Sequence, residues 1–363
     1  MTNASMTNAS MTDTSMKDAS NWTVPAWAGI DVAKATFEVA LHPAWVPGKE
    51  ILLAELPRAN FPRTAEGVAR LLDWLDGAKA PVGVRAVMET TGRYSVELAG
   101  LLLAARPSLA PAIVDAKAAS HFARSLRLRN KTDRVDAAAL ARFGAERSPA
   151  PWRPPAPEYD ALQEMSRQRR FLVESLVTAR NRLAEIESAP AVARIQRQVI
   201  ASLEKAIGRV EDLMRKHVAG NARLAAAVRR LDTAPGVAFV TATTVLGELG
   251  DLARFPTSRS LSAFAGLSPR RFESGTSVRG RSRMCKQGSP RVRQVLYLAA
   301  LAAIRNPRSR FGRSYAAMVE AGKPRMVALG AIMRKLLVTM RAMIVGETDY
   351  QDRLVPERQG AVA

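Results

Sequence analysis

The sequence predicts an α/β domain at the N-terminus followed by a mainly helical remainder, and three patterns support this fold class. Strand-like and helix-like segments alternate over residues 27–147, which is typical of an α/β domain. The proline-rich stretch 149–157 cannot continue a helix and therefore marks a domain boundary. Beyond that stretch, apolar residues recur at heptad spacing, which favours long paired helices.

The elements of the α/β part are expected from hydrophobic periodicity and from turn residues. In chain order they are strand structure over 27–34 and the alternating segment 36–41, an apolar segment at 49–56, an amphipathic helix near 64–76, a strand over 82–89, a turn at 90–92, a helix at about 95–105, a strand at 111–115 and a helix that begins at 133.

Four carboxylates lie within or at the ends of these elements. Asp31 interrupts an apolar strand, Glu89 closes a second one, and Asp133 and Asp136 share one face of a helix. Buried strand acids are unfavourable unless they are paired or bound to a cation, so a divalent metal site like that of RNase H-type nucleases would explain them. The alternative is that they are ordinary strand-end and helix-start residues with surface ion pairs. An actin-like sugar kinase opens on a similar strand but needs glycine-rich phosphate loops, which the sequence does not show.

Positive charge is concentrated in the second part of the chain. The formal net charge is +21; residues 1–150 carry 18 Lys+Arg against 15 Asp+Glu, and residues 151–363 carry 36 against 18. Such an excess predicts a polyanionic partner, namely nucleic acid, whose binding weakens steeply with salt. A basic tail or a membrane-binding surface fits less well, because the cations are interleaved with helical apolar patterning.

Composition restricts the class of protein further. The chain is 47% hydrophobic, which supports a folded core, and its single cysteine, Cys285, excludes an intramolecular disulfide. The sequence offers neither the apolar run of about 18 residues that a membrane span requires nor a signal-peptide core. We therefore expect a bacterial-type cytosolic protein without a membrane partner. The pentapeptide repeats over 1–20 predict a disordered lead-in.

The segment after the connector predicts two long antiparallel helices. Arg169 places a charged residue in the first heptad seam, and Ala179 places only a small side chain in it. A coiled-coil hairpin fits this spacing, and an ordinary helical bundle is the alternative. The apolar seam positions are Leu162, Met165, Leu172, Leu176, Leu183 and Ile186 on the first helix, and Leu203, Ile207, Val210 and Met214 on the second.

A basic, serine-bearing tract spans residues 270–293, with eight basic residues and one acid, Glu273. A serine among arginines could attack a phosphate, because the arginines would neutralise its charge. The alternative is a loop whose serines only donate hydrogen bonds to phosphate. Cys285 is expected to be a semi-buried spectator thiol. The candidate nucleic-acid-binding residues are Arg124, Arg127, Arg129, Lys131, Arg270, Arg271, Arg279, Arg281, Arg283, Lys286, Arg291 and Arg293.

Taken together, five motifs resemble the IS-one-ten family of insertion-sequence transposases, which are DEDD-type, bridge-RNA-guided recombinases. They lie within about 27–345, in family order: Gly29-Ile-Asp-Val-Ala-Lys, Met88-Glu-Thr-Thr-Gly-Arg-Tyr, Leu128-Arg-Asn-Lys-Thr-Asp-Arg-Val-Asp-Ala, Pro235-Gly-Val, and the segment from Ala263 to Gly280. Cys285 stands where relatives commonly have serine.

The resemblance implies the domain organisation. It gives a RuvC-like α/β nuclease domain of the RNase H fold at 25–148, a coiled-coil helical hairpin at 158–225 and a mainly α C-terminal transposase domain at 226–345. The residue patterns themselves add the disordered repeats at 1–24, the proline-rich linker at 149–157 and a tail at 346–363.

The resemblance also implies the chemistry. Asp31, Glu89, Asp133 and Asp136 would bind Mg²⁺, with Mn²⁺ as a substitute, and Ser274 would be the nucleophile. The implied partners are donor and target DNA, a noncoding bridge RNA and further copies of the chain in a tetramer, a dimer of dimers. Two rival functions remain: a metal-dependent junction nuclease in which Ser274 is a bystander, and a non-enzymatic nucleic-acid-binding protein.

Overall fold

The computed structural model describes residues 26–43, 51–78, 83–127, 132–186, 189–270, 273–274, 278–279, 283–285 and 287–352. The chain divides into two compact units, Met1–Pro154 and Pro155–Ala363. The repeats over 1–20 lie outside the described residues, and so do Arg129, Lys131, Arg271, Arg281 and Lys286.

The first unit is built on a mixed five-stranded sheet with the order β3-β2-β1-β4-β5. β1 pairs antiparallel with β2 and parallel with β4; β3 continues the antiparallel side and β5 the parallel side. The predicted alternation of strands and helices is thus confirmed. The elements are β1 (Ala26–Val32), β2 (Thr36–His42), β3 (Arg58–Pro62), α1 (Ala65–Gly77), β4 (Val84–Glu89), α2 (Arg93–Ala105), β5 (Ala112–Val114), α3 (Ala116–Ser125) and α4 (Asp133–Arg147).

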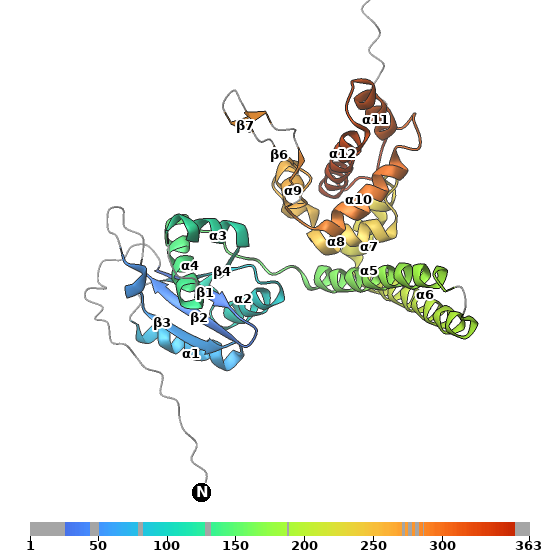
Figure 1. Ribbon diagram of the computed structural model, residues 1–363. Helices are drawn as coiled ribbons and strands as arrows, with labels where there is room; N and C mark the ends of the chain where they lie inside the picture. Colours follow the sequence, from blue (N-terminus) through green and yellow to red (C-terminus); the bar gives the residue numbers. More distant parts are fainter. Residues whose placement is uncertain are drawn as a thin grey trace, which may run out of the picture. The chain divides into compact units, whose positions relative to one another are not determined.

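Helices cover both faces of this sheet, and Figure 1 shows α1 and α4 on opposite sides of it. Because side chains alternate along a strand, Ala28 and Ile30 of β1 join the core under α1 and α2, whereas Trp27 packs with residues of α4. Gly29 faces α4 as well: a Cβ there would lie 2.0 Å from the backbone nitrogen of Ala141.

One strand of the sheet is not among the predicted elements. The apolar segment 49–56 contains a 3₁₀ turn, Leu53–Glu55, and the extended strand follows it as β3. β3 begins after Pro57, ends at Pro62 and pairs only with β2. Edge strands tolerate proline and polar residues, and for this reason β3 lacks the apolar pattern of an inner strand.

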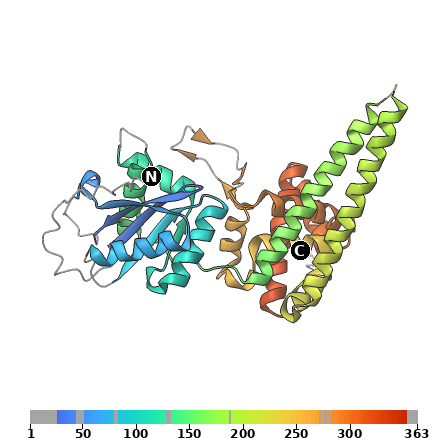
Figure 2. The same ribbon diagram turned by 90° about the horizontal axis from the view of Figure 1, so that it is seen from below.

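The second unit begins with two long helices, α5 (Pro157–Ala184) and α6 (Pro190–Ala219), which lie side by side in Figure 2. Leu162 and Met214 on the predicted seams are fully buried. Arg169, which interrupts the seam, forms an ion pair of 2.7 Å with Glu211, and Arg180 pairs with Glu204 at 2.6 Å. These pairs fix the two helices as an antiparallel hairpin.

The remaining helices of the second unit enclose an apolar core. Its buried residues include Leu246, Leu296 and Leu336, which come from three different helices. Leu162 of α5 and Met214 of α6 also belong to this core. Among the described residues, no helix is both long enough and apolar enough to cross a membrane. The helices are α7 (Ala222–Asp232), α8 (Phe239–Leu249), α9 (Ser258–Phe264), α10 (Pro290–Ala303), α11 (Arg310–Glu320) and α12 (Arg325–Val345).

Candidate active site

Two of the predicted acids lie at matching ends of neighbouring parallel strands. The β1–β4 register pairs Ile30 with Met88, so Asp31 and Glu89 are the next residues along their strands. Their side chains project from the face that carries Gly29 and Val87, two positions earlier, because side chains alternate along a strand. This is the face covered by α4.

The other two acids occupy the first turn of α4. The hydroxyl of Thr132 accepts a hydrogen bond from the N–H of Val135, which caps the helix and starts it at Asp133. The first turn of α4 therefore carries Asp133 and Asp136.

Small residues bring this helix onto the strand. A Cβ at Gly29 would lie 2.2 Å from the carbonyl oxygen of Ala137, and one at Gly144 would lie 2.6 Å from the indole of Trp27. The backbone of α4 consequently rests directly on β1, with Ala137 and Ala141 buried between them. This close approach holds the first turn of α4 beside Asp31.

The other three acids lie close enough to Asp31 to act on its ionisation. Burial and, in decreasing order, the charges of Asp133, Asp136 and Glu89 together raise the pKa of Asp31 from 3.8 to about 6, although the hydrogen bond from the N–H of Val32 lowers it. A carboxylate is harder to ionise when it is desolvated and surrounded by like charges. The arrangement therefore favours a bound cation.

The donor chemistry fits a hard divalent cation, because carboxylate oxygens are the ligands that such ions prefer. As the side chains stand, no three acids, histidines or cysteines among the described residues form a group that could hold a metal ion. Binding would thus require the carboxylates of Asp31, Glu89, Asp133 and Asp136 to rotate toward one another.

A further acid of this face, Glu38, is missing from the sequence prediction. Glu38 is paired directly with Asp31 across β1 and β2, so both side chains share one face, and it is only 7% exposed. Its carboxylate accepts a hydrogen bond of 2.9 Å from the amide of Asn60 and forms an ion pair of 3.4 Å with Arg134. Arg134 thereby ties the first turn of α4 to the sheet. No local sequence signal marks Glu38, because its place opposite Asp31 depends on the register between β1 and β2.

The basic tract forms two short antiparallel strand pairs in the second unit. β6 (Pro269–Arg270) pairs with β9 (Arg283–Met284), and β7 (Glu273–Ser274) pairs with β8 (Val278–Arg279), which places Ser274 opposite Val278. The structure describes the backbone of these strands. The serine therefore lies on a β-ribbon in one compact unit, and the four acids lie in the other.

Two arginines of the basic tract, Arg291 and Arg293, lie at the start of α10 and hold it against neighbouring segments. Arg291 forms an ion pair of 3.4 Å with Glu248, which also accepts a hydrogen bond from Ser289 and pairs with Arg167 of α5. Arg293 donates to the carbonyl oxygen of Gly288 at 2.9 Å, and its burial lowers the pKa of its guanidinium.

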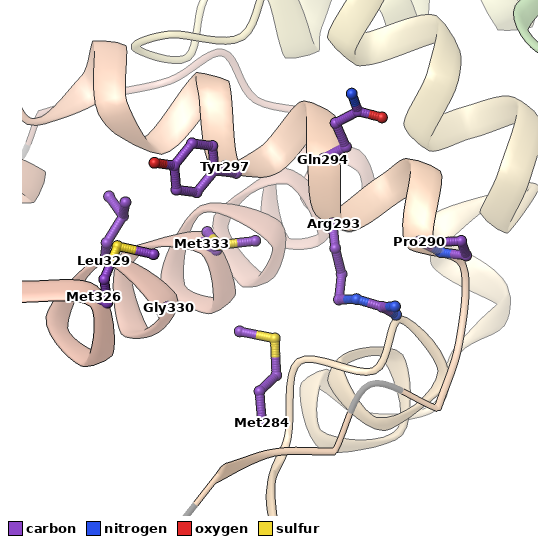
Figure 3. Close-up of a pocket in the computed structure, with 9 residues that line it drawn as sticks. All are labelled: Met284, Pro290, Arg293, Gln294, Tyr297, Met326, Leu329, Gly330 and Met333. Carbon is purple, nitrogen blue, oxygen red and sulfur yellow. The ribbon is translucent and has the colours of Figure 1, made fainter. Parts of the chain in front are cut away.

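The end of the ribbon also lies against the helices. Figure 3 shows Met284 pointing toward Met333 across a pocket of about 390 Å³ between α10 and α12. Cys285 is half-buried, and its thiol donates to the side-chain oxygen of Gln287 at 3.1 Å. In the first unit, Arg124 and Arg127 are exposed.

Comparisons with known proteins agree with this organisation. A transposase family of the DEDD type matches residues 28–186, and the family described as Transposase IS116/IS110/IS902 matches residues 228–316. The pilin gene-inverting protein of Moraxella bovis is 26% identical over 329 residues, which is 90% of this chain and 98% of that protein.

Shorter matches join these. An uncharacterized 43.6 kDa protein of insertion element IS110 from Streptomyces coelicolor is 32% identical over 125 residues, 34% of this chain and 30% of that protein. The transposase for insertion sequence element IS1111A from Coxiella burnetii is 37% identical over 84 residues, 23% of this chain and 22% of that protein. Since both family matches follow one another along the chain, and the mixed sheet fits an RNase H-like domain, the protein belongs to the IS110 family of transposases, enzymes that act on DNA.

Proposed function

We propose that this transposase excises and inserts a mobile element by metal-dependent strand exchange through a serine-linked intermediate. The raised pKa of Asp31, caused by its burial and by the charges of the other three acids, carries the metal half of this proposal. Asp31, Glu89, Asp133 and Asp136 would hold Mg²⁺, with Mn²⁺ as a substitute. The ion supplies positive charge that polarises a scissile phosphate and stabilises the leaving oxygen.

We further propose that Ser274 is the nucleophile. Its hydroxyl oxygen forms a bond to phosphorus while the bond from phosphorus to a sugar oxygen breaks, and the serine proton ends on the released sugar hydroxyl. The hydroxyl of another strand then attacks the phosphoserine and releases Ser274. Each step exchanges one phosphate ester for another, so no external energy source is required. The position of Ser274 in a basic β-ribbon supports this role, because cations neutralise the attacked phosphate.

The same proposal includes an RNA partner and an assembly of several chains. A bridge RNA would choose donor and target DNA by base pairing, and the protein would bind backbone and helical shape. The α5–α6 hairpin is proposed to be a coiled coil that contributes to a tetramer. Acids and serine lie in separate compact units, which is compatible with a site shared between protomers. We propose that the protein works in the cytosol, at the nucleoid.

The decisive experiment detects the covalent intermediate. Enzyme and labelled donor DNA are separated on a denaturing gel, and any adduct is mapped to a peptide. We expect an adduct at Ser274 that Ser274→Ala abolishes without loss of DNA binding. Ser277→Ala, a matched change in the same tract, should retain the adduct, because Ser277 would lose only a positioning hydrogen bond. DNA cleavage without any adduct would instead identify a metal-dependent nuclease.

A further inference from the structure

Part of the positive charge of the long helical hairpin is neutralised by ion pairs, whereas that of the segment 305–335, which includes the last helices, is not. Four arginines of the hairpin, Arg167, Arg169, Arg170 and Arg180, form ion pairs of 2.6–2.9 Å with glutamates. Residues 305–335, in contrast, contain eight lysines and arginines and a single acid, Glu320. That segment is described throughout, and none of its cationic side chains forms an ion pair with an acid.

One of these cations, Lys335, contacts a hydroxyl group and lies near two other cations. The ammonium of Lys335 on α12 donates a hydrogen bond to the hydroxyl of Ser314 on α11. Desolvation lowers the pKa of Lys335, and the nearby charges of Arg310 and Lys323 lower it further. α11, α12 and the turn between them therefore each contribute one positive charge to the same small region.

An acid near Arg310, Asp352, binds groups other than the side chains of these cations. The carboxylate of Asp352 accepts hydrogen bonds of 3.1 and 3.3 Å from the backbone N–H of Arg310 and a bond of 3.4 Å from the hydroxyl of Tyr350. Asp352 thus caps the start of α11. The ammonium groups of Lys323 and Lys335 remain without a carboxylate partner.

Like charges that are held together raise the free energy of the unliganded protein, and an anion relieves that repulsion. A tetrahedral phosphate offers oxygens to several donors at once, which suits two ammonium groups, one guanidinium and one hydroxyl. Because the enzyme acts on DNA, a backbone phosphodiester is the anion that it meets. We propose that Arg310, Ser314, Lys323 and Lys335 form a binding site for a nucleic-acid backbone phosphate, separate in sequence from the basic tract at 270–293.

The test measures affinity for nucleic acid as a function of salt concentration, with the full chain carrying Ser274→Ala so that strand chemistry does not consume the probe. The double variant Lys323→Gln/Lys335→Gln is compared with Arg180→Gln/Arg215→Gln. Both variants lose two positive charges, but the control arginines are paired with Glu204 and Asp212. Thermal melting of each variant checks that the fold is retained.

Duplex DNA and a stem-loop RNA of equal length serve as probes. We expect the lysine variant to bind more weakly and to lose about 0.9 from the slope of log affinity against log salt for each contact to a duplex DNA phosphate. The control should change much less. A loss confined to one probe identifies DNA or RNA as the source of the phosphate. Equal slopes and affinities for both double variants, with both probes, would overturn the proposal, whether or not Ser274 proves to be the nucleophile.

Discussion

The first unit gathers negative charge on one face of its sheet, whereas the last helices of the second unit gather positive charge. The acids project from β1, β4 and the capped start of α4, and α4 rests directly on β1. The cations sit on long, exposed side chains of α11, α12 and the turn between them. Both clusters are repulsive in the free protein. They differ in the length and flexibility of the side chains that carry the charge.

This difference has a physical consequence. Short acid side chains on a rigid backbone favour one geometry, so their function should depend on single residues and on close packing. Lysine and arginine side chains are flexible, and screening weakens exposed charges. The cationic cluster should therefore respond gradually to charge removal and to salt, and the acid cluster should respond sharply to substitution.

The largest expected effect comes from removing half of the acid cluster. Asp133→Ala/Asp136→Ala should reduce recombination by about a thousandfold or more, because metal assistance contributes several kcal/mol and each 1.36 kcal/mol is tenfold in rate. Stability should be unchanged or higher, since repulsion is relieved. Asp73→Ala/Asp76→Ala, an acid pair with the same spacing on α1, is the control. Recombination by the Asp133/Asp136 variant at the wild-type rate would refute the metal site.

The next prediction concerns the close packing of α4 on β1. Gly29→Ala should lower the free energy of unfolding by about 3 kcal/mol, because the added methyl meets backbone atoms of α4 that cannot move aside. Gly100→Ala in α2 is the matched control: a Cβ there meets nothing within 4 Å, and alanine should stabilise the helix by about 0.5–1 kcal/mol. Urea unfolding measures both. Equal stabilities would show that α4 does not rest on β1.

The ion pair between Glu38 and Arg134, which fixes the start of α4, should matter less for metal binding than the four acids themselves. Glu38→Gln removes the ion pair with Arg134 and should weaken Mn²⁺ binding by about tenfold, as loss of supporting groups around metal ligands does. Calorimetric titration of Mn²⁺ measures this effect. Glu97→Gln, which removes the ion pairs with Arg63 and Arg93 elsewhere in the same unit, should leave the affinity unchanged.

The last expected effect is the dependence of stability on pH. The folded-state pKa of Asp31 is raised to about 6 from 3.8, so protonation favours the folded state. The stability that this group contributes is fully present below about pH 4 and is lost as the pH rises through about 6. Unfolding measured between these values, without divalent ions, should show this loss in the wild type and not in Asp31→Asn. Identical pH profiles would mean that the pKa of Asp31 is not raised in the folded protein.

Local sequence signals were sufficient for the parts of the fold that local interactions determine. Thr132 before Asp133 indicates the start of α4, and the apolar heptad positions around Arg169 predict the α5–α6 hairpin. Glu38 was missed because its role depends on the register between β1 and β2, which hydrophobic alternation does not fix. The cluster around Lys335 could not be predicted either, since tertiary packing brings its residues together across a turn.

Part of the proline-rich stretch 149–157, which the sequence predicts to be a connector, is bound to the first unit. The backbone N–H of Trp152 donates to the carbonyl of Pro111 at 2.7 Å, its ring packs against the apolar core, and Arg85 donates to the carbonyl of Pro149 at 3.3 Å. A fragment that ends at Ser148, after α4, would uncover the apolar surface that Trp152 protects. Chimaeras that exchange whole units between relatives should therefore be joined between Trp152 and Pro157, so that the tryptophan travels with its own sheet.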